Sequence, residues 1–530
     1  MKRKNFILLF SVILSLLLFM TACSSNDEPE DTAKNDNSQN NVEENEGSLS
    51  EQVDSNVITG IRSSILTLDP ANHRDRTTES VLRNLYDGLV MLGVDGEIIP
   101  KIAESWENTT PTEWIFNIRE GVKFHDGSDL TAHDVKFTFD RIIKEGAMAG
   151  ETSPRLGLMG PVEGVELVDD YTVKFLLAEP WPILLKMIPH QQILPQAYIE
   201  EVGDPEWREN PIGAGPYKFV SAELDERIVF ERFDDYYEGA PSIKNLVFDV
   251  IPEVSSRIAA LQAGEVQRIT GISPDLVSVL ENDANIEVKV SEGTRVTMME
   301  MNTLEPPFDD VRVRQAMNHA INMDLVIDAI LGGYASRTNG ALLHSSFGIN
   351  EDLQPYEYNP EKAKQLLAEA GYEDGFQVVI DTHETFRDIA EAVAPQLREI
   401  GIDASSRIWD AGVIRPMLLN GERIMSIDDW GASALDPFGF LDAKLVTDAR
   451  GNFSQYSNDR VDELLNAGMS EDDVTKREEI YYEAQEIIYV EAPWVFSFVM
   501  QELEAGVKQL GNWAPSPDGM LYMPHATMSE

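Results

Sequence analysis

Cysteine is nearly absent from this 530-residue chain, since Cys23 is the single one. No disulfide can therefore form within the chain, and no metal site built on several cysteines is possible. Basic residues are also scarce: 42 Lys and Arg stand against 92 Asp and Glu, which gives a formal net charge of -50. Because phosphate binding needs clustered cations, this charge argues against nucleic acid as a partner. The excess acid either forms a heavily hydrated surface or attracts cationic solutes.

The motifs of common enzyme classes are missing as well. The sequence has no G-x-S-x-G, no H-E-x-x-H, no P-loop and no G-x-G-x-x-G after a strand. His383-Glu384 begins like a zinc-protease helix, but Arg387 stands where the second histidine is required. The eight histidines are scattered along the chain. We therefore expect no enzyme, no cofactor and no metal held by protein ligands.

The N-terminal segment has the pattern of a secretion signal. Residues 1–4 are basic after the first Met, residues 6–20 are apolar except for two serines, and Ala22 precedes Cys23. This run resembles the lipobox of bacterial lipoproteins, which implies a signal peptide over residues 1–22 and a lipid on Cys23. The alternative is an uncleaved signal anchor, because the apolar run approaches the ~20 residues that span a bilayer. Both interpretations place the body outside the cytoplasmic membrane.

Residues 23–55 are polar and acidic, with almost no large apolar side chains. Such a composition cannot bury a core, so we expect a disordered acidic tether. The remaining chain is longer than one ordinary core, which predicts two or more lobes.

The stretch of residues 103–143 combines strand and helix signals. Residues 113–119 alternate polar and apolar side chains, which predicts a strand, and residues 122–124 are predicted to start a second strand of a hairpin. Thr131 then predicts a helix N-cap, with Asp134 as its capping partner. An apolar stripe at helical spacing follows, formed by Val135, Phe139 and Ile142.

This stretch resembles the signature region of the family 5 extracellular solute-binding proteins, which deliver oligopeptides, dipeptides and nickel complexes to ABC importers. Two further segments are similar to that family: residues 211–218 (PIGAGPYK) and residues 306–316 (PPFDDVRVRQA). Downstream, residues 376–410 read as strand, helix and strand, the pattern of a βαβ unit, with Pro395 inside the helix.

The resemblance implies a two-lobed α/β hinge fold of the periplasmic-binding-protein type II, with an extra small subdomain in lobe one. It places lobe one at residues 56–305, lobe two at residues 306–505 and a return to lobe one at residues 506–530. It also implies a monomer that is anchored to the membrane by lipid and docks on an ABC permease with ATPase subunits.

The resemblance further implies a ligand site in the loop at residues 428–445 (DDWGASALDPFGFLDAKL). Trp430 is predicted to be pocket wall or core, and Asp436 either a ligand contact or the cap of a turn. Ser433 stands where peptide-binding members carry the aspartate that pairs with the peptide ammonium group. A serine hydroxyl accepts a hydrogen bond but supplies no charge, so the resemblance does not identify the solute.

Three more residues are candidates for the same site, namely Trp409, His383 and Arg387. Trp409 matches a family position that faces the cleft, and the other two lie in the loop that holds a carboxylate-binding arginine in dipeptide-binding relatives. Arg387 can instead pair with Glu391 on its own helix.

We therefore expect the substrate-binding component of an ABC importer, taking up a peptide or peptide-like solute. A nickel or other metal-chelate binding protein of the same family is the alternative. The alternatives from other functional classes are a secreted hydrolase and a structural surface lipoprotein.

Overall fold

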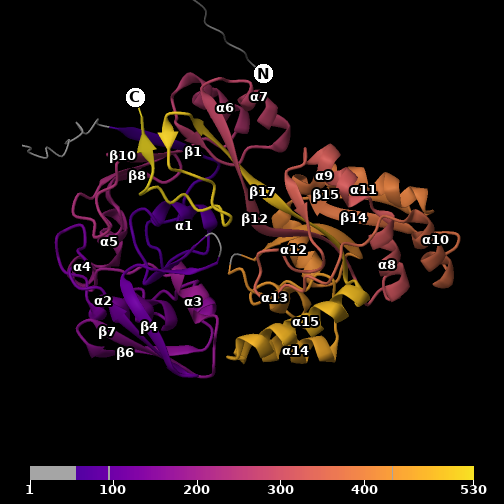
Figure 1. The fold of residues 1–530 in the computed structure, drawn as a ribbon, viewed down its shortest axis with the longest axis horizontal. Coiled ribbons are helices and arrows are strands. Elements are labelled where there is room, and N and C mark those ends of the chain that lie inside the picture. Colours follow the sequence, from indigo (N-terminus) through magenta and orange to yellow (C-terminus); the bar gives the residue numbers. More distant parts are fainter. Residues whose placement is uncertain (1–54, 94–95, 433, 530) are drawn as a thin grey trace, which may run out of the picture. The chain divides into compact units, whose positions relative to one another are not determined.

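The computed structural model describes residues 55–93, 96–432 and 434–529. The predicted signal peptide, nearly all of the predicted tether, Cys23 and Ser433 lie outside these residues. The described chain alternates strands and helices in a mixed α/β architecture (Figure 1).

The main sheet has the strand order β15-β14-β16-β12-β17-β11-β1-β10-β9-β8, with β13 paired to β17. At one end, β1 (Asn56–Ile61) pairs in parallel with β10 (Asn245–Val250) and β11 (Arg268–Ile269). The antiparallel strands β9 (Arg227–Arg232) and β8 (Tyr217–Glu223) complete this end. We call this end of the sheet, together with the described residues of 62–216 and the small subdomain that they contain, the first half.

The other end of the sheet, the second half, contains the predicted βαβ unit. Strand β14 (Gln377–His383), helix α11 (Arg387–Glu399) and strand β15 (Asp403–Trp409) follow one another, and the two strands pair in parallel. Pro395 lies inside α11, as predicted. Strand β16 (Met425–Gly431) lies next to β14 in the same direction. All three strands therefore end at the same edge of the sheet.

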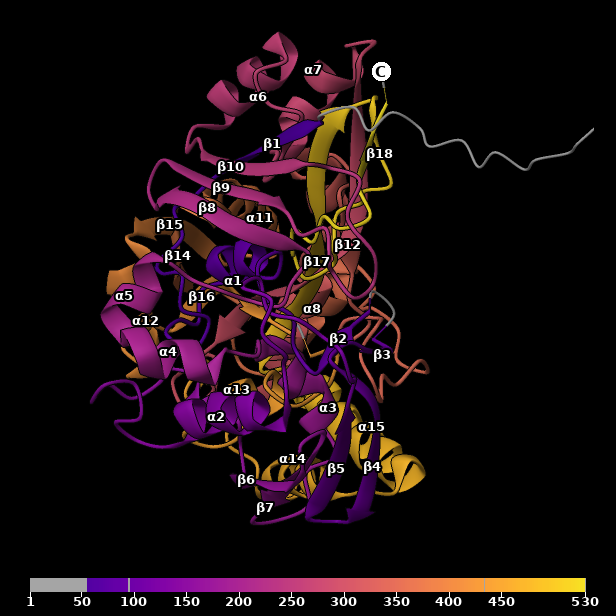
Figure 2. The ribbon, with the colours of Figure 1, turned by 90° about the vertical axis from the view of Figure 1, so that its left-hand side faces the viewer.

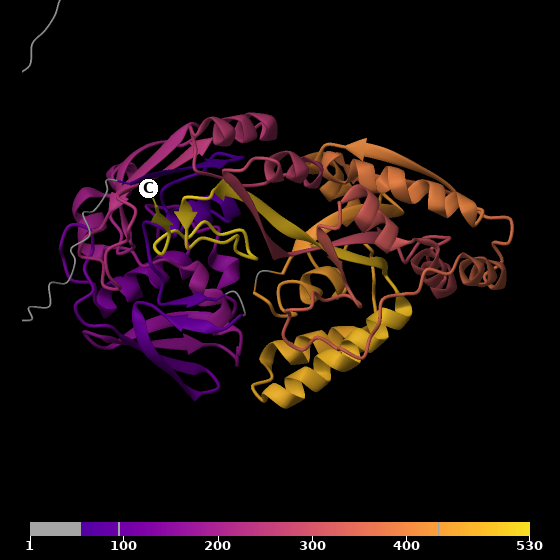
Figure 3. The same ribbon diagram turned by 45° about the horizontal axis from the view of Figure 1, so that its top comes forward.

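Two long antiparallel strands, β12 (Ile286–Met301) and β17 (Trp494–Val507), join the halves (Figure 3). Their register shifts between Glu292 and Val296, where the ladder is irregular. Met298, Met299 and Met301 are fully buried and belong to the apolar cores of this part of the chain.

A separate four-stranded sheet forms the small subdomain, in the order β4 (Ala103–Thr110), β5 (Glu113–Ile118), β7 (Thr172–Leu177) and β6 (Val162–Asp169). Helix α2 (Ala132–Ile143) lies beside this sheet (Figure 2). Its Phe139 packs edge-on against Phe175 of β7 at 4.7 Å between ring centroids. Burying each such side chain stabilises the fold by roughly 1.5–3 kcal/mol.

The local predictions for this region are confirmed in part. The Asp134 carboxylate accepts a hydrogen bond from the Thr131 backbone N–H at 2.9 Å, so the predicted N-cap of α2 is present. The hairpin prediction is wrong, because β5 pairs with β4 and β7. Residues 122–124 make only an isolated bridge between Lys123 and Asp129. The short polar turn at Asp126-Gly127 returns the chain too early for a strand to extend.

Helix α1 (Arg76–Leu82) ends before Leu85 and Leu89, although these two side chains and that of Val81 are buried. Past Leu82 the backbone carbonyls bond to another segment of the chain. The backbone N–H groups of Gly215 and Tyr217 donate to the carbonyls of residues 85 and 84, respectively. The C-terminal segment contacts this helix, because the Leu521 N–H donates to Ser80 Oγ at 3.0 Å, and Asn84 Nδ2 just past the helix donates to the Leu521 carbonyl at 2.7 Å. The lobe borders given above remain predictions.

The other elements are mostly short. The strands are β2 (Val90–Leu92), β3 (Ile98–Pro100), β13 (Ala335–Arg337), β18 (Leu510–Gly511) and β19 (Thr527–Met528). The helices are α3 (Leu184–Met187), α4 (Gln196–Val202), α5 (Asp204–Glu209), α6 (Val254–Ala263), α7 (Val277–Glu281), α8 (Val311–Ala320), α9 (Met323–Ile330), α10 (Pro360–Glu369), α12 (Ala411–Leu419), α13 (Leu441–Leu445), α14 (Asp459–Ser470) and α15 (Val474–Glu491).

Candidate functional site

Three of the predicted site residues lie at the ends of neighbouring strands. His383 ends β14 and Trp409 ends β15, and the two are register partners. Trp430 is the second-last residue of β16. We call this region, from His383 through Trp409 to Trp430, the carboxyl edge. Ligands of α/β proteins bind outside the carboxyl ends of parallel strands, so this edge is the candidate site.

Trp409 is held by charged neighbours. Its Nε1 donates to Asp381 Oδ1 at 2.6 Å, and the guanidinium groups of Arg407 and Arg423 lie 5.1 Å from the indole ring centroid. Arg407 also binds Asp381 through two contacts, at 2.6 and 2.9 Å. The indole is half-buried, and its orientation is fixed by Asp381.

His383 contacts a buried carboxylate. Its Nε2 lies 3.4 Å from Asp428 Oδ1, and Arg415 approaches the same carboxylate at 3.1 Å. Burial alone would raise the pKa of Asp428, but the hydrogen bonds from His383 and Arg415 outweigh it and lower that pKa to about 2. Asp428 is therefore ionised at neutral pH and already has partners.

Arg387 is engaged by acidic side chains of its own segment. Its guanidinium binds Glu384 at 2.6 and 2.9 Å and lies 4.0 Å from Glu391. The predicted pair with Glu391 is thus present, next to a closer one with Glu384. These exposed pairs hold the guanidinium beside the helix start, where each pair stabilises the fold only weakly.

Trp430 packs between cations. Its Nε1 donates to the Gly439 carbonyl at 3.0 Å, while Arg450 and Lys444 lie 5.0 and 5.2 Å from the ring centroid. The ring also packs edge-on against Phe453. Lys444 is itself paired with the buried Glu300 at 2.6 Å. The Trp430 indole is half-buried, so part of its surface is packed in the core and part is accessible at the carboxyl edge.

Asp436 is completely buried, with 0% exposure. Arg477 holds both of its oxygens, at 2.9 and 2.7 Å, and Lys186 lies 3.8 Å away. The Phe438 N–H donates to Asp436 Oδ1 at 3.1 Å, so the predicted turn cap is present. A ligand role for any of the six predicted residues remains a prediction.

The loop around Asp436 also contacts the first half and the small subdomain. Lys186 of α3 donates to the Leu435 carbonyl at 3.0 Å, and Phe438 packs edge-on against Trp181 at 6.0 Å. Ala434 belongs to the apolar core of the small subdomain. The loop therefore lies where the two halves meet.

Two small cavities lie among the described residues, and the first is near this meeting point. One, of about 20 Å³, is lined by Leu92, Gly93, Thr294, Leu435 and residues 516–518. The buried Thr294 hydroxyl beside it has no hydrogen-bond partner among the described residues. This volume has room for about one water molecule, which would satisfy that hydroxyl.

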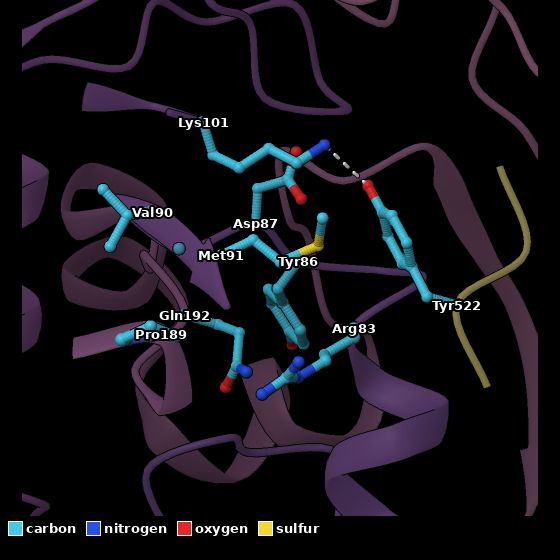
Figure 4. A pocket seen from close by; sticks show the side chains of 10 residues that line it. Arg83, Tyr86, Asp87, Val90, Met91, Lys101, Pro189, Gln192 and Tyr522 are labelled. Carbon is cyan, nitrogen blue, oxygen red and sulfur yellow. Dashed lines mark hydrogen bonds between the residues drawn. The ribbon is translucent and has the colours of Figure 1, made fainter. Parts of the chain in front are cut away.

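The second cavity, also of about 20 Å³, lies within the first half (Figure 4). Lys101 and Tyr522 close it with a 3.0 Å hydrogen bond, and the buried Gln192 amide has no partner among the described residues. Its size again matches about one water molecule. Neither cavity is large enough for a peptide.

Several charged residues at the site carried no sequence signal. Arg415, Arg450 and Arg477 stand in no motif, and each reaches its partner only through the fold. Within the described part of the chain, no group of three or more His, Cys, Asp or Glu side chains is arranged to hold a metal ion. None of the helices described here combines the length and apolar content of a membrane span.

Comparison with known proteins gives the family. The sequence model named "Bacterial extracellular solute-binding proteins, family 5 Middle" matches residues 97–452. The chain is 28% identical over 495 residues to the glutathione-binding protein GsiB of Pectobacterium atrosepticum, covering 89% of this chain and 94% of that one. It is 31% identical over 440 residues to the dipeptide-binding protein of Escherichia coli K12, covering 77% and 82%.

A solved structure agrees with this relationship. The periplasmic binding protein DppA from Helicobacter pylori, in complex with the peptide STSA, superposes with a TM-score of 0.75 at 28% identity, over 90% of this chain and 98% of that one. The likeness and the mixed α/β architecture confirm the predicted two-lobed periplasmic-binding-protein fold. The protein belongs to the bacterial extracellular solute-binding proteins of family 5, the binding components of ABC importers.

Proposed function

We propose that this protein binds a peptide or peptide-like solute between its two halves and passes it unchanged to an ABC permease with ATPase subunits. The observation that carries this proposal is the carboxyl edge, where His383, Trp409 and Trp430 lie at the ends of three neighbouring strands, with Trp430 one residue before the last of β16. The loop that follows β16 contacts the other half. The named ligands of the relatives, a dipeptide and glutathione, support a peptide-like solute. The protein is not an enzyme in this proposal, and it acts as a monomer.

A thermal-melt screen tests the proposed function. A ligand that binds only the folded protein raises its stability by RT ln(1 + [L]/Kd), so a true solute raises the melting temperature in a saturable way. Dipeptides, tetrapeptides, glutathione and a nickel–histidine complex form the panel. We expect a shift with peptides or glutathione and recovery of the compound unchanged. A shift with the nickel complex alone would support the metal-chelate alternative, and cleavage of a peptide would support a hydrolase.

We further propose that the body is held outside the cell membrane by a lipid on Cys23. The support is the sequence pattern alone, in which a basic start and an apolar run precede Ala22 and Cys23. The variant Cys23→Ser tests it. We expect wild-type protein in the membrane fraction and the variant in the soluble or secreted fraction. Equal membrane retention of both would support an uncleaved anchor instead.

A further inference from the structure

Lys186 of the first half extends its ammonium group into the second half. It stands in the short helix α3, which contributes apolar side chains to the core of the small subdomain. Its Nζ donates to the Leu435 carbonyl at 3.0 Å, lies 3.8 Å from Asp436 Oδ2 and stands 5.8 Å from the centroid of the Phe347 ring. A carbonyl, a carboxylate and an aromatic ring therefore receive one cation of the first half.

The groups that receive this ammonium group also have partners within the second half. The Phe347 N–H donates to the Leu435 carbonyl at 3.0 Å, and the Phe347 ring packs edge-on against Tyr481 of α15. Arg477 binds both oxygens of Asp436, at 2.9 and 2.7 Å. Leu435 has a left-handed backbone with a φ of 49°, which a residue with a large side chain keeps only where its surroundings fix it. The second half therefore holds the three acceptor groups in place by its own contacts.

Separation of the halves at this contact would not leave a buried charge without a partner. Asp436 would keep both of its contacts to Arg477, and the ammonium group of Lys186, whose side chain is 21% exposed here, would return to water. Breaking a buried ion pair costs much more when the remaining charge stays buried and unpaired. The contact can therefore favour the closed arrangement, in which the halves meet at this loop, and still be broken reversibly.

An apolar contact between the halves lies in the same loop. Phe438 packs edge-on against Trp181, with 6.0 Å between the ring centroids, and Trp181 is only 4% exposed. Ala434, at the other end of the loop, belongs to the apolar core of the small subdomain. Residues 434–438 of the second half therefore join the first half through both polar and apolar contacts, in addition to the connection that β12 and β17 make.

Resting on the proposed function, we propose that Lys186 is a closure residue, which holds part of the unliganded protein closed through the Leu435 carbonyl and the Asp436 carboxylate. We call these two contacts, with that to the Phe347 ring, the Lys186 latch. Because the latch forms only when the halves meet, it stabilises the closed form whether or not a solute is present. A solute that needs the closed form then binds more tightly, since its apparent dissociation constant falls as the competent fraction rises. Lys186 thus sets the affinity through the arrangement of the halves.

Small-angle X-ray scattering of the purified protein, with and without solute, tests the inference. The variant Lys186→Met removes the ammonium group and keeps an unbranched apolar side chain, whereas Lys186→Arg keeps the positive charge. The control Lys174→Met changes a lysine of β7 that pairs with Glu166 and Glu113 of the neighbouring strands in the small subdomain. Its side chain is 26% exposed, close to the 21% of Lys186. Calorimetric titration of each protein with the dipeptide Ala-Glu and with glutathione gives the affinities, and thermal melts show that each variant is folded.

We expect unliganded Lys186→Met to have a larger radius of gyration than the unliganded wild type, and a saturating solute to bring the two radii together. Its affinity for the solute should fall about tenfold, as loss of one charge-assisted contact predicts. Lys186→Arg should lie between the two proteins, and the control should match the wild type. Equal radii of unliganded wild type and Lys186→Met would overturn the inference and leave the proposed function standing. If neither compound binds, the proposed function fails, while the radii of the unliganded proteins still decide the inference.

Discussion

At the scale of single residues, the site is a set of ion pairs in which burial differs widely. Asp436 is fully buried and held by Arg477, whereas Glu384 and Arg387 form their pair in solvent. Removing one partner of a buried pair leaves a charge without compensation, which costs far more than losing an exposed pair. The two pairs therefore make a matched comparison.

The variant Asp436→Asn is nearly isosteric and leaves Arg477 as a buried, unpaired charge. We expect the free energy of unfolding to fall by about 3–5 kcal/mol in urea denaturation. The control Glu384→Gln should leave that free energy almost unchanged. A small effect of Asp436→Asn on stability, combined with loss of ligand affinity, would show instead that Asp436 acts on the solute.

His73 supplies a pH-dependent contribution. The ring is 2% exposed, its Nδ1 lies 3.1 Å from the Asp75 carbonyl, and its Nε2 lies 3.2 Å from an Arg155 nitrogen. A neutral ring that donates from Nδ1 and accepts at Nε2 satisfies both contacts. Burial, and next the charge of Arg155, lower the pKa of His73 to about 4.

Because the unfolded chain binds the proton near pH 6.5, the folded state loses stability as pH falls from 6.5 to 4. This difference in pKa amounts to about 3 kcal/mol at pH 4. The variant His73→Gln should remove that part of the pH slope when unfolding is measured at pH 7, 5.5 and 4.5. Parallel slopes of the variant and the wild type would contradict the account of His73.

At the scale of elements, the carboxyl edge depends on how β14, β15 and β16 end together. Local sequence patterns predicted the βαβ unit and the N-cap of α2, because hydrophobic periodicity and capping act over a few residues. They failed at residues 122–124, where strand pairing is decided by β4 and β7. They also missed the pair of Asp436 and Arg477, since partners 41 residues apart leave no local pattern. The family resemblance, rather than periodicity, placed Trp430 and Trp409 near this edge.

Gly451 tests whether the edge needs its close packing. A Cβ at this position would lie 2.8 Å from the Trp430 ring and 3.0 Å from the Ala443 carbonyl oxygen. Gly451→Ala should displace the indole, lower the free energy of unfolding by about 1–3 kcal/mol and weaken solute binding. The control Gly157→Ala has no atom within 4 Å of the added Cβ and should change neither quantity. Unaltered binding by Gly451→Ala would mean that Trp430 is not part of the solute site.

At the scale of the whole molecule, the two strands β12 and β17 join the halves. The loop near Asp436, which belongs to the second half, also contacts the first half. In the proposed function a solute bound there would contact both halves, and only through such differential contact can a solute favour a closed form.

Calorimetric titration of the purified protein with Ala-Glu and with glutathione tests the central claim most directly. The account predicts saturable binding of one molecule per chain, with the compound recovered chemically intact afterwards. No saturable heat with either compound or with any other peptide of the panel, or recovery of cleaved products, would contradict it.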